Sequence, residues 1–497
     1  MAGPASTTPY AEALAAVAAL AGPPAWLHAV TSPERVTEAL RRQLAPVGVT
    51  VEGARTERVR VKGGRWTVRC LATLGGGDDA LATVALTGTV SPPGGATAAP
   101  ETAAAGVLPD HPPGTARPGL VPGTRLRLPD LGLDLAVVEP EAPDPELPVV
   151  PDLLDHGRAA VLLARALGAR APARLEVLEA WVLRQKLGSR CTVGYRIGPV
   201  CDGVPDRVVA KAYADDTGER CYAAMTALTV ARHGFLAEPL GYLPEERVLL
   251  QGWVDGDTTL KELLQRSLSA GDPTVAVAAE TGLVRTGRAL SHLHRGVASY
   301  APARPYAAAL ARVRAELAEA SATAPELAAG LGPVLDALAE VDLRHPPGAP
   351  VPSHGSFRPA QVLVGGSGVT VIDLDAAGLA EPGADLGTFL GGLDSLGVSD
   401  LEAAGDLPRG ALQRRARLLD DLGSMFLAGY GRVDRPTLVR TQLWQGLELV
   451  TSVLHAWTHG RPARADSRSA LLRHHLARSS AVLASDGVLR QGAVQLG

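Results

Sequence analysis

The segment HGSFRPAQVLV, residues 354–364, carries the side chains of this chain that are best suited to chemistry, and IDLD follows it at residues 372–375. Asp373 and Asp375 stand at the end of the expected strand VTVID, where they open into a polar turn. Carboxylate oxygens together with the amide oxygen of Gln361 are ligands that Mg²⁺ accepts. The alternative is structural: the acidic pair could simply cap the turn before the next helix.

Lysine is rare in this chain, which has 48 Lys and Arg residues but only four lysines. One of them, Lys211, lies in RVVAKAYA, which we interpret as the third strand of a β-meander. A lysine on the inner face of a strand needs a partner, because an unpaired buried charge is costly. Glu219 on the following helix, or a ligand phosphate, could supply it. Alternatively, the side chain extends outward to solvent from an edge strand.

The turn LGSR, residues 187–190, connects the first two strands of the same meander. Gly188 allows close approach of the backbone, and the N–H groups of Gly188 and Ser189 could then face a phosphate. Taken alone the turn is equally typical of an ordinary hairpin. Lys211, two strands later, favours the phosphate interpretation.

The elements around these residues predict an α+β protein. The expected organisation is an α/β segment at residues 1–90, a Pro/Gly/Ala-rich linker or long loop at 91–130, a β-rich lobe at 131–250 and a helical lobe at 251–497. VRVKGGRWTVRC (59–70) is similar to VLRQKLGSRCTV (182–193), so the first segment is either a degenerate repeat of the β-rich lobe or an unrelated meander. At the place that matches Lys211 the first segment has ATVALTG (82–88).

These motifs, in this order, resemble the aminoglycoside phosphotransferase family within the wider protein-kinase-like fold. The resemblance covers about residues 175 to 480 and rests on RVVAK, GRALSHLH (287–294), HGSFRPAQVLV, IDLD and EPGADLGTF (381–389). It implies a bilobal fold with a β-rich N-lobe and an α-helical C-lobe, to which this chain adds an N-terminal α/β segment.

The resemblance also implies a role for each matching residue. Lys211 should bind the α- and β-phosphates of ATP, with Glu219 orienting it, and backbone atoms from Gln251 to Trp253 should meet the adenine. Gln361 and Asp373 should bind Mg²⁺. His354 and Asp385 look like residues that brace the catalytic loop. The acceptor pocket is expected between helices of the C-lobe, near Asp394, Tyr430 and Trp444.

Ser356 departs from the family pattern, because its position belongs to the catalytic Asp. A serine cannot accept the acceptor's proton near neutral pH, and general-base assistance is typically worth about 10²–10⁴-fold. Positioning and charge neutralisation supply most of the acceleration in phosphoryl transfer. Arg358 could neutralise developing phosphate charge, and Asp375 could act as a substitute base. We therefore expect an ATP- and Mg²⁺-dependent phosphotransferase acting on a small-molecule hydroxyl; the alternative is a pseudokinase that binds nucleotide as a scaffold or regulator.

Composition narrows the remaining possibilities. Hydrophobic content of 46% and a net charge of −4 are typical of a soluble globular protein and do not favour nucleic acid or an anionic membrane as partner. The four cysteines have no CxxC spacing, so neither a zinc site nor a disulfide framework is expected. The N-terminal residues YAEALAAVAALAG predict a surface helix rather than a signal peptide, and we expect a cytoplasmic protein. A protein partner could bind through the N-terminal domain.

Overall fold

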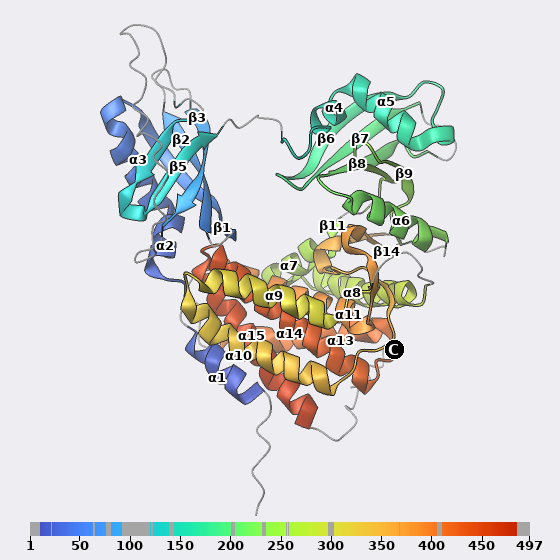
Figure 1. Cartoon of the computed structure of the whole chain (residues 1–497). Helices are drawn as coiled ribbons and strands as arrows, with labels where there is room; N and C mark the ends of the chain where they lie inside the picture. Colours follow the sequence, from blue (N-terminus) through green and yellow to red (C-terminus); the bar gives the residue numbers. More distant parts are fainter. Residues whose placement is uncertain are drawn as a thin grey trace, which may run out of the picture. The chain divides into compact units, whose positions relative to one another are not determined.

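The computed structural model describes residues 10–20, 22–62, 65–75, 81–91, 120, 123–138, 144–199, 204–230, 235–254, 256, 258–296, 303–366, 368–404 and 410–484. The chain forms two compact units. The first comprises residues 1–142, 311–337 and 450–476, and the second comprises residues 143–310, 338–449 and 477–497. Figure 1 gives the labels of the elements along the chain.

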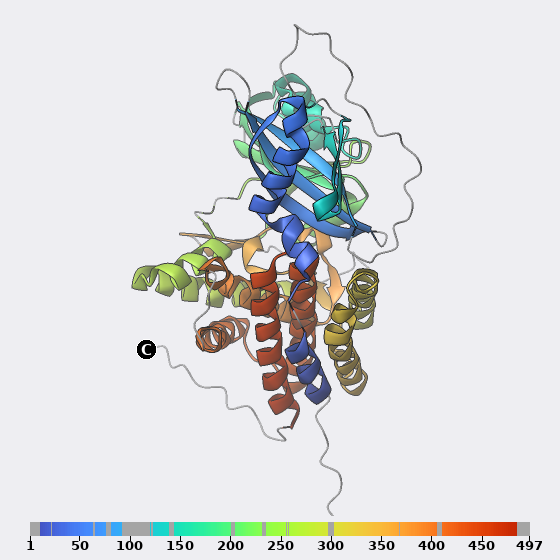
Figure 2. The ribbon, with the colours of Figure 1, turned by 90° about the vertical axis from the view of Figure 1, so that its left-hand side faces the viewer.

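The first unit contains a five-stranded antiparallel sheet in the order β1-β2-β3-β5-β4. Its elements are α1 (Tyr10–Ala19), α2 (Ala25–Thr31), α3 (Pro33–Leu44), β1 (Thr50–Lys62), β2 (Arg65–Gly75), β3 (Leu81–Val90), β4 (Arg125–Leu128) and β5 (Leu133–Val138). Helix α3 lies along one face of the sheet (Figures 1 and 2). Ser32 caps this helix by accepting a hydrogen bond from Arg35 N–H. Burial alternates along β2, as expected for a sheet with one covered face.

The N-terminal sheet extends further along the chain than the predicted boundary at residue 90. Residues 125–128 and 133–138, assigned from sequence to the linker and to the start of the next lobe, are strands of the first sheet. The sequence pattern missed them because both strands are short and follow a long Pro/Gly-rich stretch. Most of that stretch, residues 92–119 and 121–122, lies outside the described residues.

The second unit begins with another five-stranded antiparallel sheet, in the order β6-β7-β8-β10-β9. Its elements are α4 (Val150–Leu154), α5 (His156–Leu167), β6 (Glu176–Lys186), β7 (Arg190–Gly198), β8 (Arg207–Tyr213), α6 (Thr217–Val230), β9 (Pro239–Leu243) and β10 (Val248–Gly252). Helix α5 packs across strands β6, β9 and β10 (Figure 1).

The two sheets repeat each other in more than strand order. The pairing of β1 with β2 is interrupted at Glu52 and Glu57, and the pairing of β6 with β7 is interrupted at Leu178 and Leu183. Two bulges at the same spacing on the first strand are specific features that unrelated meanders have no reason to share. The interpretation of the first segment as a degenerate repeat of the β-rich lobe stays a prediction from the sequence.

The repeat does not preserve the strand lysine. Counted from the second bulge, Arg69 on β2 and Thr192 on β7 occupy equivalent positions. They pair with Thr87 and Lys211 respectively. The first sheet therefore has Thr87 where the second sheet has Lys211.

Helices dominate the rest of the chain, as the 3.6-residue periodicity predicts. They are α7 (Leu260–Ala270), α8 (Pro273–His294), α9 (Tyr306–Ser321), α10 (Pro325–Arg344), α11 (Pro382–Gly397), α12 (Ser399–Ala404), α13 (Ala411–Tyr430), α14 (Arg435–Thr458) and α15 (Pro462–Ala484). Two small sheets lie among them, one of β11 (Thr258–Thr259), β13 (Val362–Gly365) and β14 (Gly368–Val371), the other of β12 (Val351–Ser353) and β15 (Gly378–Ala380). None of the described helices combines the length and apolar character that crossing a membrane requires.

Glycines bring helices α8 and α13 into close contact. A Cβ on Gly287 would lie 2.1 Å from the carbonyl oxygen of Phe426, and a Cβ on Gly429 would meet the backbone of α8 just as closely. Only glycine fits at such a crossing. The contact brings the ends of the two helices together, so that His294 Nδ1 lies 2.9 Å from the Tyr430 hydroxyl.

Candidate active site

Lys211 meets the acidic pair inside the second unit. Its side chain is 8% exposed, and its Nζ donates to Asp373 Oδ1 at 3.0 Å and to Asp375 Oδ1 at 3.2 Å. The lysine therefore does not extend to solvent. Arg190 also contacts both aspartates, with its Nη1 2.7 Å from Asp373 Oδ1, and the hydroxyl of Tyr213 donates to Asp375 Oδ1 at 2.8 Å.

Asp373 has an unusual backbone conformation for a residue other than glycine. Its φ of 67° and ψ of 54° lie in the left-handed region, directly before the short 3₁₀ helix Leu374–Ala376. Its side chain does not cap that 3₁₀ helix. Burial raises the pKa of Asp373, but the charges of Lys211 and Arg190 outweigh this and leave it well below the usual range. Such backbone outliers concentrate at functional sites.

The prediction that Glu219 orients Lys211 is wrong. Glu219, in the first turn of α6, is exposed, whereas Lys211 is buried. The carboxylate partners of the lysine are Asp373 and Asp375 instead.

The glycine turn also differs from the expectation. Gly188 does adopt a positive φ of 66°, but its N–H donates to Asp144 Oδ2 at 2.6 Å. The N–H of Ser189 donates to the carbonyl oxygen of Lys186 at 3.1 Å. Both backbone donors that were predicted to face a phosphate are thus already engaged by the chain.

The hinge after β10 offers fewer backbone donors than expected. Gly252 N–H donates to the carbonyl oxygen of Glu238 at 2.8 Å, and Trp253 N–H donates to that of Arg207 at 3.2 Å. Gln251 is 6% exposed. The Trp253 ring packs edge-on against Trp181, with ring centroids 5.8 Å apart. An adenine at this hinge would therefore meet aromatic surface and carbonyl groups rather than these two N–H groups.

Asp385, on α11, braces the loop that begins at His354. One oxygen accepts hydrogen bonds from His354 N–H at 2.7 Å and from Ser353 Oγ at 2.8 Å, and the other accepts from Gly355 N–H at 2.9 Å. His294 Nε2 lies 3.2 Å from the same carboxylate. Burial acts to raise the pKa of Asp385, but the bonds and charge of His294 hold it below its usual range. The geometry fits the predicted bracing role.

His354 itself is fully buried, and its Nε2 lies 3.0 Å from the carbonyl oxygen of Ile372. Burial lowers its pKa, so the ring stays neutral near neutral pH. The N–H of Ile372 in turn donates to the Gln361 carbonyl oxygen at 2.9 Å. These contacts tie the loop to the segment between β14 and Asp373.

We expect Asp385→Asn to weaken this brace strongly. An amide oxygen accepts hydrogen bonds less well than a carboxylate, and its NH₂ group would face N–H donors, so the loss should be about 2–4 kcal/mol for charge-assisted bonds. Calorimetry of the second unit's unfolding transition and hydrogen exchange at the Gly355 amide measure it. Asp336→Asn, on the exposed surface, is the control and should change neither. Unchanged exchange at Gly355 would contradict the bracing role.

Ser356 and Gln361 interact within the same loop. Gln361, which ends the 3₁₀ helix Pro359–Gln361, donates from Nε2 to Ser356 Oγ at 3.3 Å. Its Oε1 is buried and has no hydrogen-bond partner. Such an orphaned amide oxygen, together with the Asp373 carboxylate, is a donor set that fits Mg²⁺, which usually takes few protein ligands and completes its shell with phosphates and water. No group of three His, Cys, Asp or Glu side chains suited to a metal occurs among the described residues.

Two residues with predicted roles near the acceptor side have ion-pair partners within the chain. Arg358 was expected to meet phosphate charge, but its guanidinium binds Glu448 on α14, with Nη2 2.8 and 2.9 Å from the two carboxylate oxygens. Asp375 was expected as a substitute base, but Arg190, Lys211 and Tyr213 all contact its carboxylate. Each side chain is already neutralised by a partner from a distant part of the chain.

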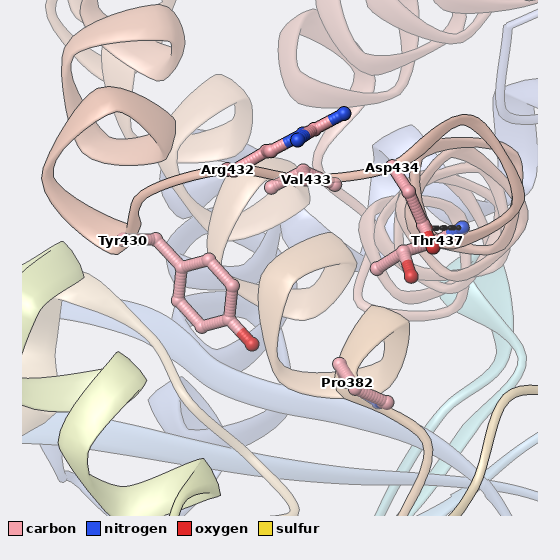
Figure 3. A pocket seen from close by; sticks show the side chains of 6 residues that line it. All are labelled: Pro382, Tyr430, Arg432, Val433, Asp434 and Thr437. Carbon is pink, nitrogen blue, oxygen red and sulfur yellow. Dashed lines mark hydrogen bonds between the residues drawn. The ribbon is translucent and has the colours of Figure 1, made fainter.

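The three residues predicted to line an acceptor pocket each bond to a different partner within the chain. Asp394 accepts a hydrogen bond from Gln445, Trp444 donates to Glu381, and Tyr430 bonds to His294. Tyr430 alone borders a surface cavity of about 430 Å³, which Figure 3 shows. The other residues that line it are Pro382, Arg432, Val433, Asp434 and Thr437.

Sequence reasoning missed three residues of this region. Arg190 directly follows the glycine turn, and Tyr213 lies two residues after Lys211 on the same strand face, so alternation could have indicated both. Glu448 gives no signal in the sequence, because it lies 90 residues from Arg358 within an ordinary amphipathic helix.

A family model and several solved structures match this chain. The sequence model of the phosphotransferase enzyme family matches residues 207–434. A glucosamine kinase structure is 17% identical, covers 92% of this chain and 99% of its own, and has a TM-score of 0.42. A choline/ethanolamine kinase family protein from Mesorhizobium loti is 14% identical, and the match has a TM-score of 0.43. The match covers 66% of this chain and 98% of that protein. An aminoglycoside phosphotransferase from Streptomyces rimosus is 17% identical, and the match has a TM-score of 0.36. The match covers 55% of this chain and 92% of that protein.

No curated protein sequence matches the chain at a significant level. The fold class is nevertheless the one that the sequence predicted: α+β, with a β-rich lobe that carries Lys211 and a helical lobe that carries the loop at His354. The segment that joins the strand lysine, this loop and the acidic pair is the segment that the family model matches. The likeness to the phosphotransferase enzyme family extends over residues 207–434 of this chain.

Proposed function

We propose that this protein is an ATP- and Mg²⁺-dependent phosphotransferase that moves the γ-phosphoryl group to a hydroxyl of a small molecule. The observation that carries the proposal is the contact of the buried Lys211 ammonium with Asp373, 3.0 Å apart. Asp373 adopts its left-handed conformation directly after a strand that the loop of His354 and Gln361 braces. A cation on a strand beside a carboxylate on a fixed turn is what a phosphate–metal pair needs.

Each residue then has a defined task. Lys211 binds the phosphates of the nucleotide as a compact positive charge. Gln361 and Asp373 are the residues that would hold Mg²⁺, which when bound supplies charge neutralisation at the transferred phosphoryl group. Asp385 and His354 fix the loop. Ser356 is left to orient the acceptor hydroxyl by a hydrogen bond, since it cannot act as a base.

Ser356 makes turnover slow rather than impossible in this proposal. The transition state of phosphoryl transfer is loose, so positioning and electrostatic stabilisation supply most of the acceleration. The acceptor class expected from the family is an antibiotic, sugar or amino alcohol. A cytoplasmic location and a protein partner for the first sheet stay predictions from the sequence.

The first test is binding. ATP with Mg²⁺ should raise the melting temperature of the full chain, because a ligand that binds only the folded state stabilises it by about 2.7 kcal/mol at 100 times its Kd. Asp373→Ala should remove most of the Mg²⁺-dependent part of this shift. Asp216→Ala, whose side chain is 72% exposed in the same lobe, is the control and should behave like the wild type.

The second test is transfer of radiolabelled phosphate from ATP to a panel of amino sugars and amino alcohols. Transfer by the wild type that Asp373→Ala abolishes is the expected result. A thermal shift without transfer to any acceptor and without ATP hydrolysis would indicate a nucleotide-binding pseudokinase instead. No shift at millimolar ATP with Mg²⁺ would overturn the proposal altogether.

A further inference from the structure

Two cationic side chains, rather than one, lie on the acidic pair of this site. Arg190 Nη1 is 2.7 Å from Asp373 Oδ1 and also contacts Asp375, while Lys211 Nζ contacts the same two carboxylates. The four side chains are between 8% and 22% exposed. Their charges cancel, so the acidic pair is fully compensated by the chain itself.

The backbone of the glycine turn cannot replace side-chain cations at a phosphate. The N–H groups of Gly188 and Ser189 already donate hydrogen bonds to Asp144 Oδ2 and to the carbonyl oxygen of Lys186. The phosphates of a bound nucleotide would therefore be met by charged side chains, and charge-assisted hydrogen bonds are the strong ones.

Arg190 is placed to make such bonds. It is the first residue of β7, directly after the turn, and pairs in register with Tyr213 at the end of the lysine strand. Both of its contacts with the aspartates use Nη1, and a guanidinium has further N–H donors in a planar fork that suits phosphate oxygens. It can thus bind an anion on one side while it stays on the acidic pair on the other.

A divalent cation on the Asp373 carboxylate would also connect this carboxylate to the phosphates. Its function in such a site is to link an aspartate to phosphate oxygens and to neutralise their charge. To reach Asp373 it would have to displace Arg190, or share the carboxylate with it. Arg190 and the metal ion are therefore alternatives at this position.

We propose that Arg190 is an internal cation of the nucleotide site: it binds the phosphates while it contacts Asp373 and Asp375, so that the chain binds nucleotide without a divalent cation. This inference rests on the proposed nucleotide site, but it concerns binding and not transfer. Divalent cations then change the affinity for ATP only modestly, because metal and arginine replace each other.

Calorimetric titration of the full chain with ATP, in EDTA and in Mg²⁺, tests the proposal. The wild type should bind ATP in EDTA with a Kd within about tenfold of its value in Mg²⁺. Arg190→Ala should weaken binding in EDTA by about 10- to 100-fold, the usual worth of one or two charge-assisted hydrogen bonds. Its binding in Mg²⁺ should change by less than about threefold. Arg190→Lys keeps the charge but not the planar fork of N–H donors. Its affinity for ATP in EDTA should lie between those of the wild type and Arg190→Ala.

Arg196→Ala is the matched control. Arg196 is on the same strand and also pairs with a carboxylate, Glu179, but on the exposed surface, so both affinities should stay unchanged. A merely structural role of Arg190 would weaken binding equally in EDTA and Mg²⁺, which would overturn the proposal. Binding of the wild type only in Mg²⁺ would overturn it and leave the proposed function intact. No binding in either condition would overturn both.

Discussion

Arg440→Met is expected to destabilise the second unit by about 3–5 kcal/mol, the usual effect of removing one partner from a buried ion pair. Arg440 is 2% exposed, and the side chain of Glu381 is 4% exposed. The guanidinium binds both oxygens of this carboxylate, with Nε 2.6 Å from Oε2, and it also contacts Asp342. Methionine fills similar space but leaves the Glu381 carboxylate without its cation.

A double variant separates the lost charge pair from lost packing. Arg440→Met with Glu381→Gln should recover more than half of the loss, because the amide is neutral and its oxygen can still accept the Trp444 indole N–H, now at 2.8 Å. Differential scanning calorimetry is the suitable measurement, since two compact units can unfold in separate transitions. Arg344→Ala removes an exposed ion pair with Glu340 and should change stability by less than about 0.5 kcal/mol.

The outcome also bears on the site. Glu381 directly precedes α11, the helix that carries Asp385. If Arg440→Met lowers the melting temperature no more than Arg344→Ala does, the buried pair does not fix the start of this helix.

Ser356→Asp is expected to raise the rate of phosphoryl transfer by about 10²–10⁴-fold, the usual contribution of a general base. The new carboxylate would stand where Ser356 Oγ now accepts a hydrogen bond from Gln361 Nε2 at 3.3 Å, so Gln361 can orient it. With an ordinary pKa of about 3.9 the aspartate is ionised at neutral pH and can accept the proton of the acceptor hydroxyl. Single-turnover transfer of labelled phosphate measures the effect.

Ser356→Asn is the matched control, because asparagine has the size of aspartate but no basicity. It should give no gain. The gain of Ser356→Asp should disappear when Asp373→Ala is combined with it, since the base has no use without a positioned phosphoryl group. If Ser356→Asp binds ATP normally but transfers no faster than Ser356→Asn, the missing base is not what limits this site.

Local patterns in the sequence were sufficient for most of the longer elements and for their order. A helical lobe was predicted at residues 251–497, and the structure has helices α7 to α15 there. Alternation and turn residues predicted the strand of Lys211 and the strand that ends at Asp373. These predictions succeed because periodicity and turn chemistry act between residues that are near each other in the chain.

The short strands 125–128 and 133–138 mark where this reasoning ends. A four-residue strand carries too little periodicity to stand out, and its pairing partner is chosen by the rest of the sheet. The similarity of two β-hairpins was visible in the sequence, but the shared strand order and bulge spacing are visible only in the structure.

The sequence by itself determined that a strand lysine, a His-led loop and an acidic pair are present in the family's order, with Ser356 at the place of the base. Only the tertiary structure decided their partners. Lys211 binds Asp373, 162 residues away, and not Glu219, eight residues away. Arg190 also binds Asp373, from which it is 183 residues away in the chain. The reason is physical: ion pairs depend on which side chains approach within about 4 Å in a poorly solvated space, and separation along the chain does not fix that distance.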